Sequence, residues 1–133
     1  MNTVAQDASD YLVAQGVGAF AATSGWSIHI DFLPDTPDTC IALMTQLGGQ
    51  GENLISPSGK LYDNALQVLV RDRDITTAME KAEEVVSTLE EMEGTTVEGV
   101  RYAVVDRTTD IARVSYDERR RMLVSGNMRI RRG

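Results

Sequence analysis

One amphipathic stretch near the middle of the chain constrains the fold most strongly. Between Ile75 and Met92 the apolar residues recur every three or four positions, which is the period of an α-helix with one buried face. Asp74 or Asp72 is available to cap the start of this helix. Because such a helix needs an apolar surface to pack against, the segments around it must supply one. Its apolar positions are Ile75, Ala78, Met79, Ala82, Val85, Val86, Leu89 and Met92.

The segments on both sides of this helix alternate with the period of two that is typical of β-strands. In "WSIHIDFL" the polar positions Ser27, His29 and Asp31 are expected on one side of a half-buried strand. "TCIALMTQ" and "NALQVLVRD" predict two more strands before the helix, and "VRYAVVDR" predicts one after it. A terminal strand follows, in which Gly126 suggests a bulge. Its two sides hold Met122, Val124, Met128 and Ile130, and Arg121, Leu123, Ser125, Asn127, Arg129 and Arg131.

A second helix is predicted at the start of the chain. "TVAQDASDYLVAQG" places Val4, Ala8, Tyr11 and Leu12 at helical spacing, and Gly16 is a natural end. With 133 residues the chain can bury one core. We therefore expect a single-domain α+β fold over residues 1–133, with an antiparallel or mixed β-sheet and two main helices packed on one face.

The connection "LGGQGENLISPSGKLYD" is long and rich in Gly, Ser and Pro. Such a segment is either a mobile arm or a ribbon that a partner orders, and we expect a long mobile loop at about 46–63. The residues of this loop that are available for contact with a partner are Gly48, Gly49, Gly51, Ser56, Ser58 and Lys60.

The charges of the chain are divided between its ends. Nine of the 13 basic residues and four of the 20 acidic residues lie in residues 101–133, which leaves four basic and 16 acidic residues in 1–100. Opposite charges can attract each other within one chain or between copies, so this division of charge is compatible with assembly of copies into a ring or filament. The acidic majority argues against nucleic-acid binding as the main function, because phosphate neutralisation favours a basic domain.

Catalytic and cofactor motifs are weak. "GVGAFA" from Gly16 follows a predicted helix, whereas a dinucleotide loop follows a strand. "SGKL" at Lys60 lacks the first glycine and the hydroxyl of a phosphate loop. Cys40 is the one cysteine and is expected to be buried, and His29 is the one histidine, so neither has a partner for metal binding. The chain also lacks the apolar run of a membrane span and the start of a secretion signal.

Four stretches together resemble the minor capsid or tail terminator proteins of long-tailed bacteriophages. They are "YLVAQGVGAF", "LPDTPDTCIALMTQLGG", "LQVLVRDRDITTAMEKAEEV" and "YDERRRMLVSGNMRIRR", in this order and spacing. The resemblance implies places for the following residues: Tyr11 and Leu12 on the first helix, Pro34 and Pro37 in a turn, Leu66 to Arg71 on a central strand, Ala78 and Ala82 in the helix packing, and Asp117, Arg121, Ser125 and Asn127 in a closing hairpin.

The same resemblance implies a late structural virion protein without enzymatic activity or cofactor. It implies a ring, most often a hexamer, that ends the tail tube at its head-proximal side and offers a surface to the head. The implied partners are other copies, the tail tube protein and a head completion protein, with passing contact to phage DNA in the lumen. Assembly is expected in the cytoplasm of the bacterial host, with no membrane contact.

We expect the ring contacts to use exposed charges of the terminal strand and of the long helix. Two other functions remain open: a head-side connector, or an α+β module that binds nucleic acid. A third alternative is a small enzyme with a site at Asp35, Asp38 and His29. The expected contact residues are Arg119, Arg120, Arg121, Arg129, Arg131, Glu83, Glu84 and Glu90.

Overall fold

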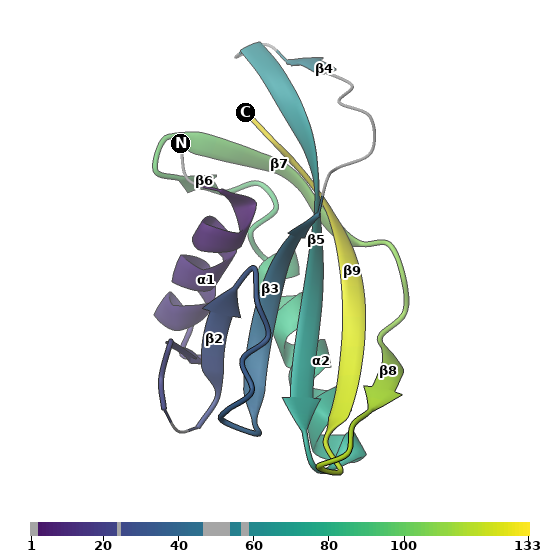
Figure 1. Cartoon of the computed structure of the whole chain (residues 1–133). Helices are drawn as coiled ribbons and strands as arrows, with labels where there is room; N and C mark the ends of the chain where they lie inside the picture. The colour runs from purple at the N-terminus through teal and green to yellow at the C-terminus, as the bar shows by residue number, and fades with distance from the viewer. Residues whose placement is uncertain (1–2, 24, 47–53, 57–58) are drawn as a thin grey trace.

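The computed structural model describes residues 3–23, 25–46, 54–56 and 59–133, in which two helices pack against a nine-stranded sheet (Figure 1). The α+β class predicted from the sequence is therefore confirmed. The elements in chain order are α1 (Val4–Ala14), β1 (Ala19–Phe20), β2 (Ser27–Ile30), β3 (Cys40–Gln46), β4 (Leu54–Ser56), β5 (Gly59–Asp72), α2 (Ile75–Glu90), β6 (Thr96–Val97), β7 (Val100–Arg107), β8 (Ala112–Tyr116) and β9 (Met122–Arg132).

The sheet is mixed and its strands do not follow the chain order. Neighbouring strands run β1-β2-β3-β5-β9-β7-β6, while β4 pairs with β5 and β8 pairs with β9. The pairs β1–β2 and β2–β3 are parallel, and the other pairs are antiparallel. β9 is long enough to pair with β8 along its first part and with β7 along its second. The C-terminal strand therefore lies inside the sheet rather than at its edge.

Both helices begin and end where their sequences predict. Thr3 caps α1 by accepting a hydrogen bond from the backbone N–H of Gln6 at 3.2 Å, and Gly16, just beyond the helix, has φ 75°. Asp74 caps α2 by accepting from the N–H of Thr76 at 3.2 Å. No helix follows "GVGAFA", since the chain enters β1 there, which agrees with a turn rather than a cofactor loop.

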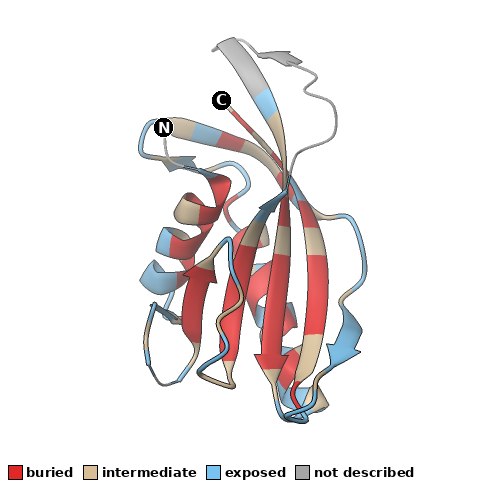
Figure 2. Cartoon of the chain, viewed as in Figure 1, coloured by how far each residue is buried: buried red, intermediate tan, exposed pale blue. Residues whose placement is uncertain are grey.

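The two helices cover one face of the sheet and bury a single core. α1 packs against β2, β3 and β5, and α2 packs against β5, β7 and β9. Figure 2 shows the buried residues running along the central strands, whereas β8 is exposed over its whole length. The largest side chains that are fully buried include Tyr102, Leu12, Ile28, Ile41, Leu43, Leu66 and Leu89.

The opposite face of the sheet is partly covered by the chain itself. The segment 31–39 returns across this face, where the guanidinium of Arg71 donates to the backbone oxygens of Pro37 at 2.7 Å and Asp38 at 3.0 Å. Ser27, which pairs with Cys40 on the neighbouring strand β3, is fully buried, and His29 is only 7% exposed. The expectation that β2 is half-buried is thus wrong, because the pattern of one strand does not reveal a covering loop.

Gly126 does not produce the bulge that the sequence suggests. β9 pairs with β5 in unbroken register from Met122 to Arg132, and the irregularities lie in β7 and β8 instead. A Cβ atom on Gly126 would lie 3.3 Å from side-chain carbons of Val86 and Ile111. α2 and the segment before β8 therefore approach the strand closely at this glycine.

Candidate functional site

In the turn between β8 and β9, one of the predicted contact residues, Arg121, lies in a cluster of ion pairs. Arg121 lies 2.7 Å from the Asp117 carboxylate, 3.4 Å from that of Asp38 and 3.6 Å from that of Asp35, and its side chain is 6% exposed. The backbone N–H groups of Arg121 and Arg119 also donate to Asp117, and these hydrogen bonds hold the pKa of its carboxyl below the usual range. Arg121 therefore anchors the turn to the 31–39 segment.

The two arginines before it are exposed, as expected. Arg119 lies 3.1 Å from Asp35, and both side chains are more than half exposed, so this pair contributes little to stability. Arg120 is exposed with φ 59° and makes no ion pair in the described part of the chain. The expectation that all three arginines are exposed is wrong for Arg121, because its carboxylate partners come from a segment far away in the sequence.

Two glutamates of α2 form ion pairs with an arginine of β7. Arg107 on β7 lies 2.8 Å from Glu83 and 2.6 Å from Glu90, and its hydrogen bonds lower the pKa of Glu83. Glu84 lies 3.3 Å from Lys81, whose ammonium group lies 5.3 Å from the centre of the Trp26 ring. Part of the attraction between the acidic helix α2 and the basic residues of 101–133 is therefore an interaction within one chain.

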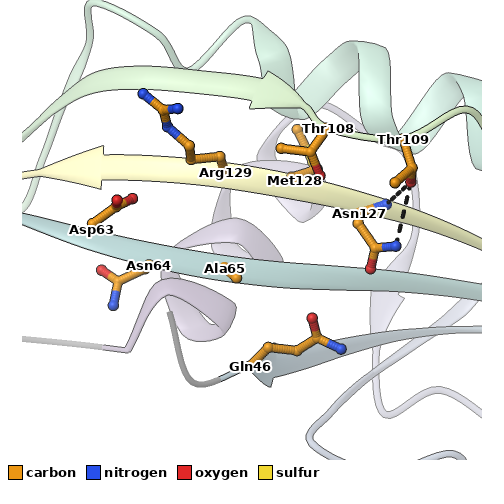
Figure 3. Close-up of a pocket in the computed structure, with 9 residues that line it drawn as sticks. All are labelled: Gln46, Asp63, Asn64, Ala65, Thr108, Thr109, Asn127, Met128 and Arg129. Atoms are coloured by element: carbon orange, nitrogen blue, oxygen red, sulfur yellow. Dashed lines mark hydrogen bonds between the residues drawn. The ribbon is translucent and has the colours of Figure 1, made fainter. Parts of the chain in front are cut away.

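A shallow groove of about 390 Å³ lies on the sheet face away from the helices (Figure 3). Asn127 donates from its side-chain nitrogen to the hydroxyl of Thr109 at 3.3 Å, and its backbone oxygen accepts from the N–H of Thr108 at 2.8 Å. Arg129 is exposed at the groove, and Asp63 lies on the neighbouring strand. The lining residues are Gln46, Asp63, Asn64, Ala65, Thr108, Thr109, Asn127, Met128 and Arg129.

This groove does not have the properties of a small-molecule pocket. Such pockets are enclosed, whereas this groove is open to solvent, and amide, hydroxyl and charged groups are among the residues that line it. Arg131 lies on the same face, 3.9 Å from Asp63, so it has a nearby counter-charge. The predicted contact residues Arg129 and Arg131 thus lie on the same face of β9, on the side of the sheet away from the helices.

The predicted contact loop is described only in part. Gly48, Gly49, Gly51 and Ser58 lie outside the described residues. Ser56 ends β4 and Lys60 lies in β5, and these two strands form an antiparallel ribbon.

Asp35 and Asp38 both lie beside Arg121, and the structure does not bring His29 into this group. The hollow beside Asp35 is lined by acidic and basic residues of the β8–β9 turn and not by His29. The ring of His29 is 2.9 Å from the Ser27 hydroxyl, and burial lowers its pKa. Among the described residues no group of three His, Cys, Asp or Glu side chains could hold a metal ion, and no described helix is long and apolar enough to cross a membrane.

The structure also contains a buried polar cluster that the sequence analysis missed. Asp7 on α1 accepts a hydrogen bond from the Tyr102 hydroxyl, and Arg132 reaches the same carboxylate at 3.5 Å. The sequence pattern places both charged residues on sides that are expected to be buried. Asp7 lies on the apolar stripe of α1 beside Val4 and Ala8, and Arg132 continues the apolar side of β9. A charge on a predicted buried stripe indicates a buried partner.

The chain matches known proteins at two levels. A family model described as "Bacteriophage tail terminator protein" matches residues 11–132. Among solved structures, a chain of the virion of a native gene transfer agent particle is similar, with a TM-score of 0.63, 13% sequence identity, and 97% of this chain and 93% of that chain covered. At this identity the likeness shows the fold alone, and a comparison with curated proteins finds no match. Because the family model covers most of the sequence, the chain belongs to the bacteriophage tail terminator family.

Proposed function

We propose that this protein forms a ring at the head-proximal end of a phage tail tube, stops growth of the tube and presents the surface that the head joins. The observation that carries the proposal is membership of the tail terminator family over residues 11–132. This is a family of structural virion proteins of phage tails. We expect six copies in the ring, from the resemblance of the four sequence stretches.

The proposed partners are other copies, the tail tube protein and a head completion protein, which meet during assembly in the host cytoplasm. Exposed polar surface is available for such contacts at the groove that includes Arg129 and Asn127 and on the outer side of α2 at Glu84. Charged and polar groups at an interface determine the choice of partner more than they determine the affinity. Arg119 and Arg120 remain proposed contact residues, whereas Arg121 supports the turn that presents them.

We also propose that any contact with DNA passing through the ring is weak. Arg131 and Arg107 have carboxylates of the same chain beside them, which reduces their attraction for phosphate groups. Release of counterions from DNA would then be small, and retention of DNA by the protein should fall to nothing at moderate salt. DNA retention that persists at 0.2 M salt would favour the nucleic-acid-binding alternative.

Extension of preformed tubes tests the proposal directly. The protein carries a gold label on a cysteine introduced at Glu91, an exposed residue at the end of α2, and is added to tubes of the cognate tube protein. Labels at one end only, together with an arrest of extension, are the expected result. Labels along the walls or an unchanged extension rate would contradict the terminator role. Binding to head particles without any binding to tubes would identify a head-side connector.

A further inference from the structure

We propose, on the basis of the ring function above, that copies of this chain join head to tail by pairing β8 of one copy with β1 of the next. The sheets of neighbouring copies would then run into one another around the ring. The occupant of each free sheet edge is therefore a second copy of the same chain. Four observations carry this assignment: the level of the two strands in the sheet, their directions, their exposed side chains and their charges.

The pairing register places β1 and β8 at the two ends of the same rows of paired residues, so the two strands lie at the same height along the sheet. The pairings of β1, β2, β3, β5, β9 and β8 connect into one row across the sheet. A second row lies directly beside it. The first row runs through Phe20, Ile28, Ile41, Val70, Val124 and Arg113, and the second through Ala19, Ser27, Cys40, Arg71, Leu123 and Ser115. A copy added in the plane of the sheet therefore brings β1 to the level of β8.

The strand directions favour this pairing as well. β1, β2 and β3 are parallel, β5 is antiparallel to β3, β9 is antiparallel to β5, and β8 is antiparallel to β9. β8 thus runs opposite to β1. When a second copy continues the sheet in the same orientation, its β1 lies antiparallel to the β8 it meets, which is the more stable of the two pairing geometries.

Both edges expose large apolar side chains. Phe20 is 57% exposed on β1, and Val114 and Tyr116 are 58% and 53% exposed on β8. Partners across a sheet share a face, so Phe20 lies on the helix-covered face with Ile28, and Tyr116 lies on that face with Met122. Natural proteins protect free strand edges from pairing with other chains, and apolar side chains along an open edge are typical of an edge that is paired in the assembly.

The charges at the two edges have opposite signs. Arg113 on β8 and Arg120 in the following turn are exposed, make no ion pair in the described part of the chain, and outnumber the one exposed carboxylate of that turn, Glu118. On the other side, Asp10 is exposed on α1, and Asp31 is exposed where β2 ends beside β1. This arrangement attracts unlike edges and repels like ones, so it favours a head-to-tail contact over a two-fold dimer.

Crosslinking of variants with one introduced cysteine each tests the pairing. Phe20→Cys and Arg113→Cys proteins are mixed and treated with a short bis-maleimide, both free and bound to tubes. The native Cys40 is fully buried, and burial raises the pKa of its thiol, so the unmodified chain serves as the reagent control. Antiparallel partners lie within about 5.5 Å, inside the span of the reagent.

The expected products identify a head-to-tail contact. The mixture should give covalent dimers and nothing larger, each variant alone should give none, and the Phe20→Cys, Arg113→Cys double variant should give a ladder up to the ring size. Glu91→Cys mixed with Arg113→Cys should give no dimer, because Glu91 lies at the end of α2. Dimers from Phe20→Cys alone, or none from the mixture, would overturn the proposal.

A blocking variant provides an independent readout. Val114→Lys places a charge on the exposed edge strand and should reduce the particle mass to that of the monomer without changing the unfolding midpoint. Thr96→Lys is the matched control, because Thr96 is also exposed on an edge strand, β6, which pairs with β7 and takes no part in the proposed contact. Equal effects of the two substitutions would contradict the assignment of β8.

The outcomes separate this inference from the proposed function. Rings of normal mass that do not crosslink through Phe20 and Arg113 would overturn the edge pairing and leave the terminator role intact. Crosslinked rings that fail to stop tube extension would support the pairing and contradict the terminator role. Monomers both in solution and at tube ends would contradict both.

Discussion

The Arg132 guanidinium lies 3.5 Å from the carboxylate of Asp7, which joins the last strand to the first helix across 125 residues of sequence. Both side chains are almost completely buried, and the Tyr102 hydroxyl lies between the two groups, 3.4 Å from Arg132. Breaking a buried ion pair leaves one charge without compensation, which costs more than the intact pair contributes. A buried ion pair therefore joins the first helix to the last strand.

The first prediction concerns this buried pair. Asp7→Ala should lower the free energy of unfolding by about 3–5 kcal/mol, because it removes one member of a buried ion pair. Tyr102→Phe keeps the ring volume and removes one hydrogen bond, so it should cost about 1–2 kcal/mol. Urea unfolding of the two variants measures both values. Equal losses would show that the carboxylate contributes no more than the hydroxyl.

The helices and most strands could be predicted because their patterns are local. The spacing from Ile75 to Met92 and the capping residue Asp74 fix α2 without reference to other segments, and the alternation of 100–107 fixes β7. The order of the strands could not be predicted from the sequence, because β9 inserts between β5 and β7 through pairings that span much of the chain. The covering segment 31–39 was missed for the same reason.

The candidate site was predicted less well than the fold. A cluster such as "ERRR" shows charge but not which guanidinium turns inward, and Arg121 is buried because Asp35 and Asp38 lie across from it. In the same way, Glu83 and Glu90 have the spacing of a solvated helix face, yet both contact Arg107. Electrostatic partners that are distant in the sequence cannot be assigned from the sequence of a single chain.

The second prediction separates the three arginines of the β8–β9 turn. Arg121→Ala should lower the free energy of unfolding by about 1.5–3 kcal/mol, because it removes hydrogen bonds to charged groups beneath the turn. The double variant Arg119→Glu, Arg120→Glu should leave stability within about 0.5 kcal/mol, since both side chains are exposed.

Thermal unfolding and particle mass, recorded on the same samples, distinguish the two roles. If the double variant assembles as well as the unmodified protein, Arg119 and Arg120 serve solubility rather than contact. A loss of stability in the double variant equal to that in Arg121→Ala would contradict the assignment of Arg121 as the structural member of the three.

The third prediction concerns Gly18, the second glycine of "GVGAFA". A Cβ atom at this position would lie 2.8 Å from the backbone oxygen of Trp26, which cannot move without disturbing the pairing of β1 with β2. Gly18→Ala should therefore cost about 1–3 kcal/mol, the range for overpacked sites. Gly126→Ala is the milder control, because its Cβ would meet side-chain carbons at 3.3 Å. A larger loss at Gly126 than at Gly18, measured by urea unfolding, would contradict this account.

The last prediction uses the single histidine as a reporter of pH-dependent stability. Burial lowers the pKa of His29 below its ordinary value of 6.5, and the charge of Arg71 acts in the same direction. The unfolded chain therefore binds more protons at this residue than the folded chain does. Its contribution to stability is fully present above about pH 6.5 and is lost as the pH falls through the lower pKa of the folded state.

His29→Gln keeps a polar side chain beside Ser27 but removes this titration. The free energy of unfolding of the unmodified protein should rise from pH 5 to pH 6.5 more steeply than that of the variant, and the two slopes should agree from pH 7 to pH 8. Urea unfolding at half-unit intervals of pH measures both slopes. Because the carboxylates are shared by the two proteins, their titration cancels in the difference. A difference between the two proteins that does not change with pH would mean that His29 titrates alike in the folded and unfolded chains, which its burial beneath the 31–39 segment argues against.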